Sequence, residues 1–116
     1  MDQLNVFELA LLFALAENCP SLYTHIDKLR VVERECTGVG QYIFLKYNNE
    51  NDLLLFSENI LSNYKLIEIE GLEVGLGFVG NANDGKLINI EIFVYGSDDW
   101  NCDYTGFRLR DLRLSR

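Results

Sequence analysis

The stretch LGFVGNANDGKLINIEIFVY, residues 76–95, decides the fold of this chain. Leu76 to Val79 and Lys86 to Tyr95 are rich in β-branched and aromatic residues, as strands are. Between them, Gly80 to Gly85 supplies the Asn, Asp and Gly residues that tolerate positive φ angles in a tight connection. The stretch therefore predicts an antiparallel hairpin.

Further strands are predicted on both sides of this hairpin. Arg30 to Thr37 and Gln41 to Tyr47 form a second hairpin across three residues that include two glycines. Lys65 to Val74 alternates, with Leu66, Glu68 and Glu70 on one side, and indicates a strand with one wet face. Phe107 to Leu114 is the last expected strand, with outward arginines that protect a sheet edge.

Helices are expected only before the strands. Residues 3–18 combine Leu, Ala and Glu without Gly or Pro, and Ser21 can cap a second, shorter helix through Lys28. The first helix is apolar nearly all round, so we expect it in the core or partly buried in a homodimer. This order predicts one α+β domain, residues 1–116: an N-terminal helix and a short second helix packed on a mainly antiparallel, curved sheet of about five to seven strands.

Charge narrows the choice of partner. The formal net charge is −8, and residues 1–107 alone hold 6 Lys/Arg against 17 Asp/Glu, whereas the last nine residues carry +3. Such a field repels phosphate backbones, so nucleic acid is not expected as a ligand. It attracts basic proteins, although a charge that serves only solubility is the simpler interpretation.

Cysteine usage and apolar runs predict a cytoplasmic protein. Cys19, Cys36 and Cys102 are odd in number, widely spaced and without a CxxC pair, which favours reduced thiols. With His25 as the lone histidine, expected on a helix surface, no metal site is predicted. The apolar run Val6 to Ala16 is too short to cross a bilayer and lacks a basic segment before it.

One motif suggests a cofactor. Gly75 to Gly80 reads GxGxxG, which binds a pyrophosphate where it opens a helix. A turn and another strand pattern follow here, so the glycines are expected to permit bulges or close packing. We therefore predict no cofactor.

The segment Asp98 to Tyr104 is the most suggestive loop. It places Trp100 and Tyr104 among three carboxylates directly after a strand. Trp and Tyr often anchor protein interfaces, and carboxylates can meet Lys or Arg of a basic partner. The alternative is that Trp100 closes the core beneath the last strand.

The stretch from Gly71 to Trp100 resembles hairpins of small bacterial immunity proteins, the antidotes of polymorphic and contact-dependent growth inhibition toxins. It carries GLEVGLGFV, then DGKLINIEIFVYG, then DDW. The resemblance implies a cytoplasmic protein that binds and neutralises one cognate toxin domain, often a basic nuclease. It assigns no site residue, because these proteins share no invariant contact motif that can be matched here.

Three hypotheses follow, and the leading one is a non-enzymatic toxin inhibitor with an acidic surface. A second is a module for a small apolar ligand, lined by Phe44, Phe78 and Phe93. A third is a small hydrolase using sheet carboxylates such as Glu91. The inhibitor hypothesis uses these partner-binding residues: Glu68, Glu70, Glu73, Asp98, Asp99, Trp100, Asp103 and Tyr104.

Overall fold

The predicted hairpin at residues 76–95 forms the middle of a seven-stranded sheet. The computed structural model describes residues 2–114, so Arg116, one of the C-terminal arginines, lies outside it. β5 (Leu76–Asn83) pairs antiparallel with β6 (Lys86–Val94). Asp84 and Gly85 alone connect them, with φ angles of 53° and 77°, as a two-residue type I′ turn requires. The hairpin is confirmed, and β5 extends four residues further than expected.

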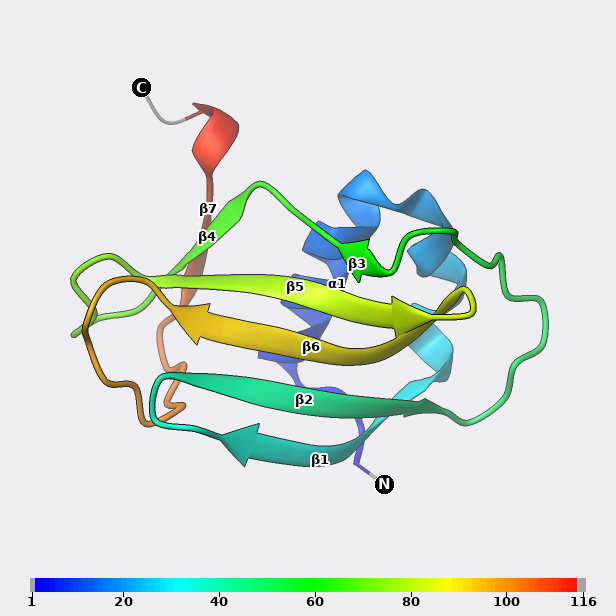
Figure 1. Ribbon diagram of the computed structural model, residues 1–116, viewed down its shortest axis with the longest axis horizontal. Coiled ribbons are helices and arrows are strands. Elements are labelled where there is room, and N and C mark those ends of the chain that lie inside the picture. Colours follow the sequence, from blue (N-terminus) through cyan, green and yellow to red (C-terminus); the bar gives the residue numbers. More distant parts are fainter. Residues whose placement is uncertain (1, 115–116) are drawn as a thin grey trace.

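The remaining strands complete an antiparallel sheet (Figure 1). They are β1 (Leu29–Cys36), β2 (Gly40–Tyr47), β3 (Ile60–Leu61), β4 (Lys65–Glu68) and β7 (Arg108–Asp111). The order is β1-β2-β6-β5-β4-β7, with β3 also paired to β5. The prediction of a mainly antiparallel sheet of five to seven strands is confirmed, and β7 lies at an edge as expected.

The strand predicted over Lys65 to Val74 is too long. β4 ends at Glu68, and the chain then turns through Gly71 and Gly75, whose φ angles are 96° and 128°. A side chain at Gly75 would also place its Cβ 2.5 Å from the Ile67 carbonyl oxygen. Glu70 therefore lies in a turn and not on the wet face of a strand.

The second helix is also different from the prediction. Residues 21–28 were expected to form one helix, but the chain forms two 3₁₀ helices, η1 (Pro20–Thr24) and η2 (Ile26–Lys28). Their backbone hydrogen bonds span three residues, as in the bond from the His25 N–H to the Leu22 carbonyl (2.8 Å). The last expected strand is likewise shorter, because β7 gives way to η3 (Leu112–Leu114).

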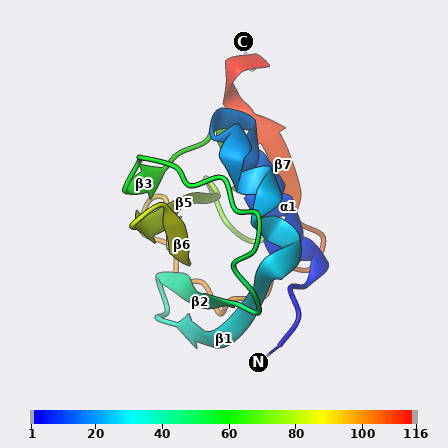
Figure 2. The ribbon, with the colours of Figure 1, turned by 90° about the vertical axis from the view of Figure 1, so that its right-hand side faces the viewer.

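The N-terminal helix α1 (Val6–Asn18) is confirmed, although it begins three residues later than predicted. Asn5 and Glu8 form a capping box that fixes its start: the Asn5 side chain accepts from the Glu8 N–H, and the Glu8 carboxylate accepts from the Asn5 N–H. Figure 2 shows α1 lying within the curve of the sheet, between β5 and β7. In residues 2–114, no helix is long and apolar enough to span a membrane.

Burial of α1 against the sheet forms the core. Gly80 allows α1 to approach β5 closely, because a Cβ at this position would lie 3.2 Å from Leu15 of α1 and 2.9 Å from Leu87 of β6. Val6 and Phe13 stay exposed on α1, so the homodimer through this helix remains a prediction. The largest fully buried side chains are Phe7, Leu11, Leu12, Leu15, Leu22, Leu29, Ile43, Leu61, Ile67, Leu76, Ile90 and Ile92.

An ion pair ties α1 to β1 inside this arrangement. Glu8 is only 1% exposed. Arg34 of β1 donates two hydrogen bonds to the Glu8 carboxylate, from Nε to Oε2 (2.6 Å) and from Nη2 to Oε1 (2.9 Å). Removing one partner of a buried ion pair is costly because the remaining charge loses its compensation.

We expect Arg34→Met to lower the free energy of unfolding by roughly 2–3 kcal/mol, somewhat less than for a fully buried pair because Arg34 is partly exposed. Arg108→Met is the matched control: Arg108 pairs with Glu68 at the surface, and its loss should cost less than about 1 kcal/mol. Urea unfolding of both variants measures the difference. Equal, small losses would show that the Glu8–Arg34 pair does not hold the helix.

Candidate functional site

Six of the eight predicted partner-binding residues line two adjoining cavities. One cavity has a volume of about 660 Å³ and the other of about 390 Å³. They share Ile69, Glu70 and Leu72, and we refer to the two together as the acidic cleft. The predicted residues in it are Glu68, Glu70, Glu73, Asp99, Trp100 and Asp103.

Two loops build the acidic cleft, and they lie at the same end of the sheet in Figure 1, between β4 and β5 and between β6 and β7. The other two predicted residues support these loops. Asp98 accepts a hydrogen bond from the backbone N–H of Glu73 (2.8 Å) and so joins one loop to the other. The Tyr104 ring stacks on Phe7 of α1, with centroids 4.5 Å apart, and its hydroxyl accepts from the Asn5 side chain.

Trp100 closes the core, which was the alternative interpretation of this residue. Its side chain is buried, with 4% exposed, and its indole N–H donates to the Asp103 carbonyl (2.9 Å). Its backbone N–H donates to the Gly38 carbonyl in the β1–β2 turn (2.8 Å). Trp100 therefore holds the loop in place, and the structure does not present it as a free interface anchor.

Cys36 and Cys102 form a disulfide, so the prediction of three reduced thiols is wrong for this pair. The pairing was hidden from sequence spacing because 66 positions separate the two residues. The fold brings the end of β1 against the loop before β7, with Cα atoms 6.1 Å apart. Cys19 is free and buried, and burial raises the pKa of its thiol, which makes it a poor nucleophile.

Reduction should destabilise the chain, because the bond closes a long loop in the unfolded state. For a separation of 66 residues the chain-entropy relation gives about 4 kcal/mol. Urea unfolding followed by the fluorescence of Trp100 should therefore show a less stable protein in reductant. The Cys36→Ser, Cys102→Ser double variant should match the reduced wild type and be insensitive to reductant. Identical stability of the oxidised and reduced wild type would contradict this.

The carboxylates of the acidic cleft differ in how they are neutralised. Glu68 forms ion pairs with Arg108 (3.5 Å) and Arg110 (3.1 Å). Glu70 and Asp99 pair with no lysine or arginine among the described residues. Each is therefore available to a cation from outside.

Asp103 is held in its charged form. Its Oδ1 accepts from both the hydroxyl (2.6 Å) and the backbone N–H (2.9 Å) of Thr105. These bonds lower the pKa of the Asp103 carboxyl. Thr105 itself lines the larger cavity and was not predicted, although the Asp-x-Thr spacing is a signal for such a turn.

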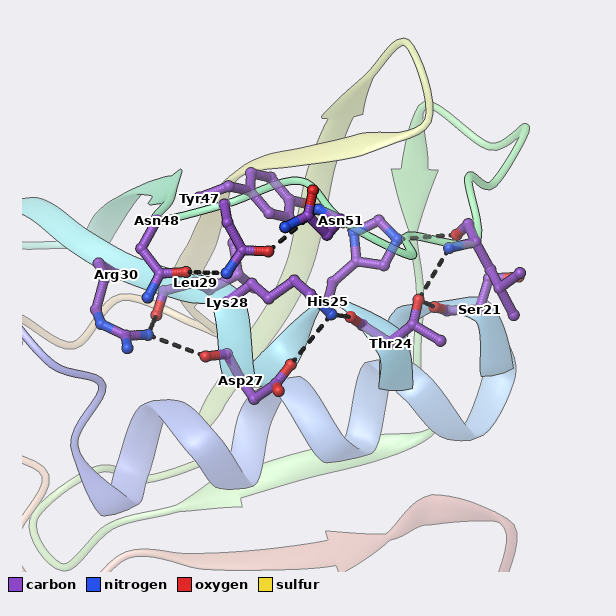
Figure 3. A network of polar contacts seen from close by, with 12 residues as sticks. Ser21, Thr24, His25, Asp27, Lys28, Leu29, Arg30, Tyr47, Asn48 and Asn51 are labelled. Atoms are coloured by element: carbon purple, nitrogen blue, oxygen red, sulfur yellow. Dashed lines mark hydrogen bonds and ion pairs between the residues drawn. The ribbon is translucent and has the colours of Figure 1, made fainter.

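His25 is fully buried, which corrects the expectation of a helix-surface histidine. Figure 3 shows it between η1 and β2. Its Nδ1 lies 2.7 Å from the Tyr47 hydroxyl and its Nε2 lies 2.8 Å from the Leu54 carbonyl. Because the carbonyl can only accept, Nε2 carries the proton, and Tyr47 donates to Nδ1 while accepting from the Leu87 N–H. The network is satisfied and structural.

Burial sets the protonation of this pair. It lowers the pKa of His25 below its ordinary 6.5 and raises the pKa of Tyr47 to about 12. Both groups are therefore neutral at pH 7 in the folded chain.

The free energy of unfolding should fall as pH drops below 6.5, because the unfolded chain then binds a proton at His25 that the folded chain does not. The stability is fully present above pH 6.5, and the loss has a limiting slope of about 1.4 kcal/mol per pH unit. We expect this component to be absent in His25→Gln. Urea unfolding at pH 5, 6 and 7 compares the two proteins, and carboxylate effects common to both cancel. Equal slopes would refute the assignment.

The residues of the two alternative hypotheses are not brought together. Phe78 faces the core, whereas Phe44 and Phe93 lie on the opposite face of the sheet, by the alternation around the buried Ile43 and Ile92. They do not line one apolar pocket.

Glu91 lies on β6, accepts from Asn81 (3.1 Å) and does not line the acidic cleft. It is therefore separate from Glu68, Glu70 and Glu73, which line that cleft. Gly75 to Gly80 runs from a turn into β5 and opens no helix. Residues 2–114 hold no group of three His, Cys, Asp or Glu side chains placed for a metal ion.

No protein-family model, no curated protein and no solved structure matches this chain.

Proposed function

We propose that this protein binds and neutralises a basic toxin domain through the acidic cleft, as an immunity protein of a polymorphic toxin or contact-dependent growth inhibition system. The observation that carries the proposal is a set of carboxylates around one cavity, Glu70, Asp99 and Asp103, none of which forms an ion pair within residues 2–114. The sequence resemblance over residues 71–100 supplies the biological class.

Charge supports a basic partner. A cleft rimmed by carboxylates raises the local concentration of cations and speeds the encounter with a positively charged surface. A catalytic nuclease domain is basic because it must approach phosphates, so the same surface that binds nucleic acid would fit against these residues. The inhibitor would then act by covering that surface, with no catalysis of its own.

Rigid loops favour such binding. The Trp100 hydrogen bond and the Asp98–Glu73 hydrogen bond hold both loops before any partner arrives. A preorganised surface loses little conformational entropy on association. Affinity would therefore depend chiefly on the match of charge and shape.

We place the protein in the cytoplasm, where such an inhibitor would meet its toxin. Thiols there are kept reduced, whereas disulfides persist in oxidising compartments. In the cytoplasm the Cys36–Cys102 disulfide of the structure would be reduced, which would leave two adjacent thiols. The Trp100 and Asp98 hydrogen bonds then hold the loop in the reduced state.

Calorimetry with the C-terminal domain encoded by the neighbouring gene tests the function. We expect tight one-to-one binding whose affinity falls as salt rises. A Glu70→Gln, Asp99→Asn double variant should bind at least about tenfold more weakly, equivalent to about 1.4 kcal/mol.

Asp52→Asn is the matched control, since Asp52 is an exposed carboxylate in the distant turn after β2 and Asn tolerates its positive φ of 58°. Its affinity should stay within about twofold of wild type, a difference of less than about 0.5 kcal/mol. Absence of binding at either salt concentration would overturn the function. Tight binding unchanged by the double variant would overturn the assignment to the acidic cleft.

A further inference from the structure

A second surface lies on the face of the sheet turned away from α1. It is made of strand residues, whereas loops build the acidic cleft. Ile43 of β2 and Ile92 of β6 are buried on the α1 side, so their strand neighbours Tyr42, Phe44 and Phe93 lie on the other side. Figure 2 shows α1 and the 3₁₀ helices on one side of β2, β5 and β6, and no helix on the other. We call this other side the outer face.

Aromatic rings form the floor of the outer face. Tyr42 and Phe44 stack, with centroids 5.9 Å apart and an interplanar angle of 16°, and Phe93 meets Tyr95 edge-on at 5.4 Å. Gly77 of β5 stands opposite Phe93, and a Cβ there would lie 2.4 Å from the Phe93 ring. The missing side chain lets the ring lie across β5, which widens the floor.

Three glutamates stand directly opposite two of these rings on the neighbouring strands. Glu35 of β1 and Glu91 of β6 stand opposite Tyr42 from its two sides, and Glu33 stands opposite Phe44. Directly opposed residues share a face of the sheet. Among residues 2–114 none of the three glutamates pairs with a lysine or arginine. Tyr42 and Phe44 therefore each lie beside a carboxylate that no lysine or arginine of residues 2–114 neutralises.

This combination matches the chemistry of a guanidinium group. Arginine stacks on aromatic faces and forms paired hydrogen bonds with a carboxylate, whereas lysine provides a compact point charge. The chain already shows the stacking elsewhere: the Arg113 guanidinium lies over the Tyr64 ring, 4.6 Å from its centroid. At the far end of the outer face Arg30 stands opposite Lys46, which would confine a basic ligand to the half around Tyr42.

We propose that the outer face is a docking surface for an arginine-bearing segment of a protein, with guanidinium groups stacked on Tyr42 and Phe44 and paired with Glu35 and Glu91. Charge complementarity selects the occupant, since the whole chain carries −8 and the carboxylates of this face form no ion pair with a lysine or arginine of residues 2–114. The surface shares no residue with the acidic cleft, so it does not rest on the proposed function.

The test is an NMR titration of the full ¹⁵N-labelled chain with a capped hexa-arginine peptide, and with hexa-lysine for comparison. Saturable shifts should centre on the amides of residues 33–35, 42–44 and 91–93. Hexa-lysine should bind at least about fivefold more weakly, because it lacks the planar group that stacks.

Variants separate the outer face from the acidic cleft. Tyr42→Thr keeps a strand-forming residue, and a Glu35→Gln, Glu91→Gln double variant keeps the shape of both side chains; each should weaken hexa-arginine binding about tenfold. Glu70→Gln, Asp99→Asn is the control and should change it less than twofold, a small effect for a remote charge. If Tyr42→Thr loses its dispersed spectrum, the glutamine variant decides.

Two outcomes would overturn the proposal. One is a set of shifts confined to residues 68–73 and 98–105, which would locate arginine binding in the acidic cleft. The other is equal binding of both peptides, unaffected by the outer-face variants, which would show unspecific attraction to an acidic protein. Neither outcome depends on toxin binding, because the titration contains no toxin.

Discussion

The carboxylate of Glu8 is the point on which the structure depends. It closes the capping box at the start of α1 and, in the same position, accepts both hydrogen bonds from Arg34 of β1. A buried charge is tolerated only where its partners are complete. The helix therefore has one permitted placement relative to β1, and the core between α1 and the sheet is assembled around it.

That placement separates the two surfaces of the molecule. With α1 occupying the concave side of the sheet, the loops at one end are left to carry carboxylates, and the convex side is left without a helix (Figure 2). The acidic cleft is made of loops braced by Trp100, whereas the outer face is made of strand residues in fixed register. Both surfaces are rigid for different reasons, and both carry carboxylates that pair with no lysine or arginine of residues 2–114.

Local patterns predicted the elements well and the long-range contacts poorly. The alternation and turn residues at 76–95 and the helix-forming composition of residues 3–18 located β5, β6 and α1, because these signals act between near neighbours.

The end of β4 depended on Gly71 and Gly75, which an alternating pattern conceals. The burial of His25 and the bond between Cys36 and Cys102 depend on segments distant in sequence. No spacing rule in a single sequence reveals such partners. The composition of the loop 98–104 drew attention to Asp98, Asp99 and Asp103, whereas Glu68, Glu70 and Glu73 were chosen from a strand pattern that in the structure ends at Glu68.

The Cys36–Cys102 bond also changes the topology of the chain. It closes a covalent ring that contains β2, β3, β4, β5 and β6, with α1 and β7 attached outside it. A protease that cuts once within this ring, for example in the exposed segment 48–55, would open the ring without releasing a fragment. As long as the bond persists, a cut protein would keep its parts together and could retain its shape, whereas the same cut in a reduced chain would leave two separable pieces.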